Sequence, residues 1–170
     1  MTVYVALLRA INVGGRKLVM KDLAAIGNEL GFGGCRTFIA SGNLLFTSAE
    51  DEQTVKGKLE HALREHMGAE VPVMVRTARE MCAVAAANPF CDKPGNRVVA
   101  MFLDNRPPRD ALASATGIRD EQMELGYREI YIFYGDGMAD SKLRIPAAAS
   151  GTARNMNTVA RLAELAREMA

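Results

Sequence analysis

The hydrophobic positions along the chain follow two different periods, and these predict a regular succession of strands and helices. Residues 3–8 (VYVALL) form an unbroken apolar run, which predicts a buried strand. Over residues 23–30 three apolar side chains recur with helical spacing, and Gly31 follows where glycine commonly ends a helix. Two more apolar segments, 36–40 and 44–47, are separated by Ser-Gly-Asn, and this pattern predicts a hairpin.

The next segments complete a first folding unit. Residues 48–51 can act as a capping box, and residues 55–67 then keep one apolar helix face that ends at Gly68. Residues 71–75 predict a further strand. The expected order is therefore β-α-β-β-α-β, which is typical of the ferredoxin-like fold. A second capping box at 77–80 opens a short extra helix.

The second half of the chain predicts a shorter version of the same succession. The segment at 88–96 is rich in Pro, Gly and Asn and is interpreted as a linker. After it we expect a strand at 98–103, a helical stretch to about residue 115, a hairpin of strands 122–125 and 130–134, and a last helix. The expected fold class is α+β, with two ferredoxin-like repeats in one chain. The repeats span 1–87 (with the extra helix) and 97–170, and the second lacks its closing strand.

Composition and charge narrow the classes of function. The 170 residues are 49% hydrophobic, enough for a real core, and the formal net charge is +1. Both ends of the sequence are mildly basic and the middle is acidic. A dedicated nucleic-acid-binding domain is usually strongly basic, so the total charge does not favour that class.

The cysteines and histidines indicate neither a disulfide framework nor a metal site. Cys35, Cys82 and Cys91 are odd in number and none form a CxxC pair, which fits a reducing compartment. His61 and His66 are five positions apart and therefore do not share a helix face. No apolar run approaches the roughly 20 residues of a membrane span. We expect a cytoplasmic protein with no metal, no cofactor and no membrane partner.

Two glycine-bearing motifs are candidates for binding an anion. The first runs from Arg9 to Lys17 between a strand and a helix, where glycines let backbone N–H groups approach an anion. Its spacing is neither GxGxxG nor a P-loop, and a tight turn with solvated cations is an equal alternative. The second is Ser41-Gly42-Asn43, for which a simple hairpin turn is the favoured interpretation when the loop is judged alone. In the expected topology it shares one sheet edge with the first motif.

A third motif lies at the start of the last helix. It comprises Arg154, Asn155, Asn157 and Thr158 after Gly151. One Asn and one Thr are explained as caps for the first helical N–H groups. The second Asn, with an arginine close by, indicates an anion at this helix N-terminus.

These three motifs together resemble a bacterial family called domain of unknown function 1697. The resemblance rests on residues 7–15 (LLRAINVGG), 36–43 (RTFIASGN) and 151–159 (GTARNMNTV), with support from 88–90 and 128–131. It implies two ferredoxin-like repeats and a bacterial origin, and it implies no activity. One departure is Met156, where the family usually has Trp. A ligand-stacking Trp would be weakened by this change, whereas a flexible Met can replace a packing Trp.

The sequence thus favours a protein that binds a phosphate-bearing or other anionic small molecule, as a binding protein or as an enzyme. The candidate ligand-binding residues are Arg9, Asn12, Gly14, Gly15, Lys17, Ser41, Gly42, Asn43, Arg154, Asn155, Asn157 and Thr158. Two alternatives stay open: a nucleic-acid-binding module, and a protein-interaction domain whose motifs are purely structural. Whether the N-terminal and C-terminal motifs form one site, and the oligomeric state, are left open as well.

Overall fold

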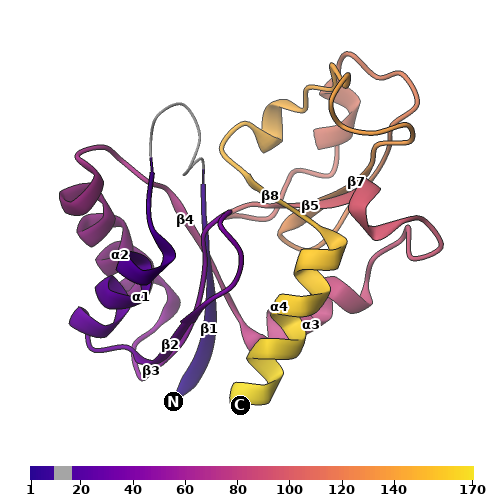
Figure 1. Cartoon of the computed structure of the whole chain (residues 1–170). Helices are drawn as coiled ribbons and strands as arrows, with labels where there is room; N and C mark the ends of the chain where they lie inside the picture. Colours follow the sequence, from indigo (N-terminus) through magenta and orange to yellow (C-terminus); the bar gives the residue numbers. More distant parts are fainter. Residues whose placement is uncertain (10–16) are drawn as a thin grey trace. The chain divides into compact units, whose positions relative to one another are not determined.

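The fold is α+β, as expected, and contains two four-stranded antiparallel sheets (Figure 1). The computed structural model describes residues 1–9 and 17–170. The chain divides into two compact units. The first unit comprises Met1–Cys82 together with Leu162–Ala170, and the second comprises Ala83–Arg161.

The first unit is built around a sheet with strand order β2-β3-β1-β4. Its elements along the chain are β1 (Thr2–Leu8), α1 (Met20–Glu29), β2 (Gly33–Thr37), β3 (Asn43–Ser48), α2 (Glu52–Met67) and β4 (Val73–Thr77). β1 pairs antiparallel with both β3 and β4, so it is a central strand. The unbroken apolar run of residues 3–8 is explained by this position, because a central strand covered on both faces is apolar on both.

Both faces of this sheet are buried. Figure 1 shows α1 and α2 on the same face, where fifteen buried apolar residues form one cluster in the described part of the chain. Alternate residues such as Val5, Leu7 and Leu45 are turned to the opposite face and are equally buried. The last turns of α4 (Met156–Met169) belong to this unit. They contact α3 (Ala78–Ala86), whose Cys82 thiol donates to the Ala163 carbonyl at 3.7 Å.

The second strand begins and ends earlier than the expected range of 36–40. β2 spans Gly33–Thr37, with a register irregularity between Gly33 and Arg36 where Gly34 has φ +59°. Ile39 has φ +51°, in the left-handed region that extended strands do not occupy. The strand therefore cannot continue to residue 40, and the hairpin connection is longer than the Ser-Gly-Asn turn that the sequence predicts.

One helix cap differs from expectation and one is confirmed. α2 is capped by Asp51, whose side chain accepts a hydrogen bond from the Thr54 N–H at 2.8 Å, and this lowers the pKa of Asp51. Ser48 instead accepts from the N–H of Glu50, so the expected capping box of residues 48–51 does not form. The box at the start of α3 is confirmed: the Thr77 N–H donates to Glu80, and the Glu80 N–H donates to the Thr77 hydroxyl.

The second unit contains a sheet with strand order β6-β7-β5-β8. Its strands are β5 (Val98–Phe102), β6 (Gln122–Leu125), β7 (Glu129–Phe133) and β8 (Thr152–Asn155). The expectation that this half lacks a closing strand is wrong, because β8 pairs antiparallel with β5. Its four residues, TARN, show no apolar alternation and directly precede a helix, so the sequence does not predict a strand there.

The helical elements in the connections of the second unit are much shorter than those in the first. The helical stretch expected up to about residue 115 is only a 3₁₀ turn at Ala111–Ser114, and a second 3₁₀ turn spans Pro146–Ala148. Pro107-Pro108 and a short Ala-rich run do not supply the three helical turns that cover a sheet face. Among the described residues, four buried side chains form the apolar cluster on this sheet face, and nine others are only partly buried.

Candidate functional site

Three chain segments meet at the end of the first sheet where the central strand β1 finishes. The Leu8 N–H donates to the Gly42 carbonyl at 2.9 Å, and the Arg9 N–H donates to the Pro72 carbonyl at 3.0 Å. The pairing of Leu7 with Asn43 continues this contact along the strands. The convergence expected from antiparallel pairing is therefore present. Arg9 is half-buried at this edge, and Lys17, where the described chain resumes, is exposed.

The loop from residue 38 to residue 43 is held in a single shape by a buried amide. Asn43 is fully buried, and its side-chain N–H₂ donates to the Phe38 carbonyl at 2.8 Å and to the Ser41 hydroxyl at 3.1 Å. Gly42 has φ +91°, a conformation that glycine adopts without strain, and its carbonyl reaches β1. Asn43 therefore shapes the loop, whereas the exposed Ser41 is the residue of this motif that a ligand could contact.

Three of the predicted site residues, Asn12, Gly14 and Gly15, lie outside the described residues. The described neighbours of that segment are consistent with an anion site. α1 begins at Met20 with Val19 as its N-cap, and valine has no side-chain acceptor for the first helical N–H groups. An uncapped helix N-terminus carries a partial positive charge.

The third motif divides into structural and less constrained residues. The Asn155 side chain accepts a hydrogen bond from the Thr158 N–H at 3.0 Å, which is the N-cap interaction expected for one of the two asparagines. Thr158 is buried, and Asn157 is exposed. A Cβ on Gly95 would collide with the Asn157 side-chain oxygen, so the glycine allows this close approach. Met156 is buried, which fits a packing role at the position where the family has Trp.

Arg154 is a buried cation of the second unit. It is 8% exposed, lies on β8 opposite Ala100 and donates to the Ala153 carbonyl at 2.9 Å. Burial lowers the pKa of its guanidinium to about 10, so the group is still charged at neutral pH. Arg154 and Arg9 belong to different units.

The hairpin of β6 and β7 does not present the aromatic surface of an RNA-binding sheet. Tyr131 is buried and its hydroxyl donates to the Val84 carbonyl at 2.8 Å. Phe133 contacts Phe90, with ring centroids 6.1 Å apart. Tyr127 is 68% exposed, and Arg106 lies over its ring. Since Tyr131 is used internally, a row of stacking side chains is not available on this face.

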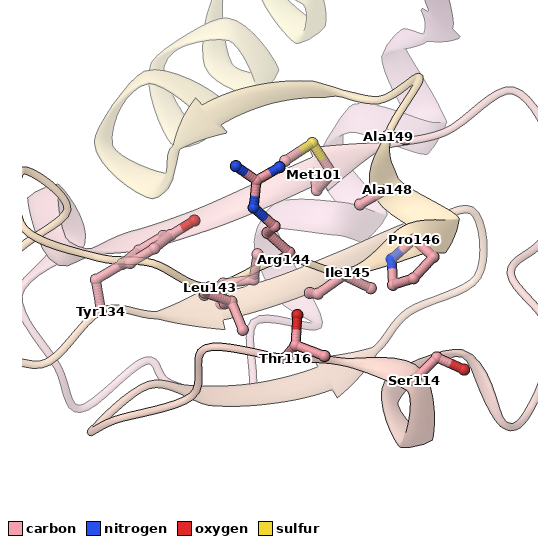
Figure 2. A pocket seen from close by; sticks show the side chains of 11 residues that line it. Met101, Ser114, Thr116, Tyr134, Leu143, Arg144, Ile145, Pro146, Ala148 and Ala149 are labelled. Carbon is pink, nitrogen blue, oxygen red and sulfur yellow. The ribbon is translucent and has the colours of Figure 1, made fainter.

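The structure contains a pocket that the sequence did not indicate. Figure 2 shows it in the second unit, with a volume of about 440 Å³. Its lining consists of Met101, Ser114, Thr116, Ile132, Tyr134, Leu143, Arg144, Ile145, Pro146, Ala148 and Ala149. These residues come from β5, from β7 and its continuation, and from the two short connections. These residues belong to no sequence motif. The one indication in the sequence is that the two connections show only a weak helical pattern, which would leave the sheet incompletely covered.

The described residues hold no group of three or more His, Cys, Asp or Glu side chains suited to a metal ion. No helix in the described ranges is long and apolar enough to cross a bilayer.

Comparisons with known proteins place the chain in a family. No curated protein matches it. A solved structure titled "conserved bacterial protein SP0830 from Streptococcus pneumoniae" has a TM-score of 0.79 and 24% sequence identity, over 97% of this chain and 98% of that one. At this identity the likeness shows the fold alone. A family model described as "Protein of unknown function (DUF1697)" matches residues 1–131, so the resemblance expected from the motifs is confirmed and the chain belongs to this family.

Proposed function

We propose that the protein binds a phosphate-bearing or other anionic small molecule at the edge of the first sheet where β1 ends. The observation that carries this proposal is the backbone hydrogen bond between Leu8 and Gly42. It brings the loop of Ser41 next to Arg9. A cation and an exposed hydroxyl then lie near each other within one unit, and groups of this kind form charge-assisted and neutral hydrogen bonds to an anion.

The surroundings of this edge support the same proposal. The N-terminus of α1 follows two residues after Lys17, and it adds partial positive charge without a side-chain cap from Val19. Ile39 is 47% exposed at φ +51° in the neighbouring loop. Backbone strain of this kind is found at ligand sites because the surrounding structure maintains it for a role other than stability.

A fold-level inference belongs with this proposal. The element order β-α-β-β-α-β and the sheet order of the first unit agree with a ferredoxin-like repeat. The second sheet has the equivalent order, β6-β7-β5-β8, with 3₁₀ turns in place of its helices. We infer that the two units are related repeats, and that 3₁₀ turns stand in the second where the first has helices.

The proposal is tested by thermal unfolding at low salt with inorganic phosphate, nucleotides, sugar phosphates, short RNA and short DNA. A ligand at 100 times its Kd stabilises the fold by about 2.7 kcal/mol, which raises Tm by several degrees at this chain length. We expect one class of small phosphates to raise Tm of the wild type and of Lys58→Ala, but not of Arg9→Ala. Lys58 is a matched control because it is a half-exposed cation of the same unit that lies on α2 and pairs with Glu50.

Two outcomes would count against this function. Equal responses of Arg9→Ala and the wild type would exclude the edge of β1 as the site. A response to RNA or DNA alone that falls steeply with salt would favour the nucleic-acid alternative.

A further inference from the structure

The pocket of the second unit lies on a sheet face that its own chain covers only in part. In the first unit, helices of 10 and 16 residues cover the corresponding sheet. In the second, the 3₁₀ turns Ala111–Ser114 and Pro146–Ala148 are the helical elements of the two connections. The apolar side chains of β5, β6 and β7 on this face are left mostly half-buried. A molecule that enters the pocket would complete this core.

The lining is apolar over most of its surface. Seven residues supply this character: Met101, Ile132, Leu143, Ile145, Pro146, Ala148 and Ala149. Pockets of about 300–1,000 Å³ with such a lining are typical of small-molecule sites. The volume of about 440 Å³ therefore fits the hydrocarbon part of a small ligand.

The polar side chains of the pocket can all donate hydrogen bonds, and the hydroxyls can also accept them. Arg144 contributes a guanidinium, and Ser114, Thr116 and Tyr134 contribute hydroxyls. Figure 2 shows the guanidinium and the Tyr134 hydroxyl directed toward the same side of the pocket. Among the described residues that line it, none is acidic. Burial, and then the charge of Glu121, raise the pKa of Tyr134, so its hydroxyl keeps its proton across the neutral range. The Glu121 carboxylate accepts from Ser141 and from the Arg119 N–H.

We propose that this pocket binds a small molecule with an apolar body and a carboxylate head. Arg144 pairs with the carboxylate, the hydroxyls of Tyr134 and Thr116 donate to it, and the apolar side chains enclose the hydrocarbon. A carboxylate fits better than a phosphate dianion because one cation lines the pocket within the described part of the chain. Planar guanidinium and carboxylate groups also match in a two-bond geometry.

The side chain of Arg144 can be replaced without removing its backbone hydrogen bonds. The backbone of Arg144 exchanges two 2.9 Å hydrogen bonds with that of Thr116, and these do not depend on its side chain. Arg144→Gln therefore removes the charge and keeps the strand-like bridge. Lys142 is an exposed cation two positions away that does not line the pocket, so Lys142→Gln is the matched control.

The test is isothermal titration calorimetry of the full chain with octanoate, 1-octanol and octylamine. We expect octanoate to bind with a negative heat-capacity change, which is the mark of apolar burial. Arg144→Gln should weaken octanoate binding about tenfold or more, as expected when a hydrogen bond to a charged group is lost. Lys142→Gln should bind octanoate like the wild type, and octylamine should bind no better than octanol.

A second variant tests the hydrocarbon part separately. Ala148→Leu places three more carbon atoms in the pocket, and it should abolish octanoate binding while a cooperative unfolding transition is retained. Absence of octanoate binding to the wild type would overturn the proposal, as would equal weakening by Arg144→Gln and Lys142→Gln. Arg9→Ala should leave octanoate binding unchanged, so this inference and the proposed phosphate site fail or hold independently.

Discussion

At the scale of single residues, the polar side chains of the three motifs divide into those that are buried or cap a helix and those that are exposed to solvent. Asn43 and Asn155 are used internally, one to close a loop and one to cap a helix. Ser41, Lys17 and Asn157 are exposed. Residue type alone does not distinguish the two groups, because an asparagine that caps a helix has the same side chain as one that binds a ligand.

Asn43 gives the sharpest residue-scale prediction. Asn43→Ala removes two hydrogen bonds and leaves the Phe38 carbonyl without this donor, so the free energy of unfolding should fall by about 1–3 kcal/mol. Ser41→Ala removes one of these two hydrogen bonds at an exposed position and keeps the bond to the Phe38 carbonyl, so it should lower the free energy of unfolding by less than Asn43→Ala, about 0.5–1 kcal/mol. Urea denaturation of both variants measures these effects. A stable Asn43→Ala would show that the loop does not depend on this amide.

At the scale of elements, most of the first unit was predictable from hydrophobic period. The apolar run of residues 3–8, the helix faces of α1 and α2 and the capping box of α3 lie where the pattern indicates. The errors arise where backbone geometry or tertiary pairing prevails over local signal. Ile39 ends β2 through a left-handed φ, and β8 exists because β5 pairs with it. Neither effect has a local sequence signature.

One hydrogen bond between two elements predicts that the free energy of unfolding depends on pH. The Tyr131 hydroxyl of β7 donates to the Val84 carbonyl of α3, and burial followed by the charge of Glu129 raises its pKa to about 12. The folded state therefore keeps this proton above pH 10, where the unfolded chain loses it. The contribution of Tyr131 is complete below pH 10 and is lost as the pH rises from 10 to 12.

Tyr131→Phe tests whether the stabilisation by Tyr131 decreases as the pH rises. The variant should have a free energy of unfolding lower by about 0.5–1.5 kcal/mol at pH 8, since one hydrogen bond is removed. The difference from the wild type should shrink at pH 11. Tyr127→Phe, at a largely exposed position, should match the wild type at both values. A difference for Tyr131→Phe that is constant or larger at pH 11, measured by urea denaturation, would contradict the assignment.

At the scale of the whole molecule, the two units share a sheet order but differ in how their sheets are covered. Helices cover one face of the first sheet, whereas 3₁₀ turns leave a pocket on the second. The sequence located the edge of β1 because motif and topology coincide there. It could not locate the pocket, because the pocket exists where 3₁₀ turns replace the helices that would cover the sheet, and Arg144 and Tyr134 belong to no motif.

The most direct test of the proposed anion site is a ¹H–¹⁵N NMR titration of the wild type with inorganic phosphate and pyrophosphate at low salt. We predict saturable shifts of the amides of Arg9, Lys17, Ser41 and Gly42, while those of Thr116 and Arg144 in the pocket stay unchanged. Shifts that are absent, or that gather away from the end of β1, would contradict the account.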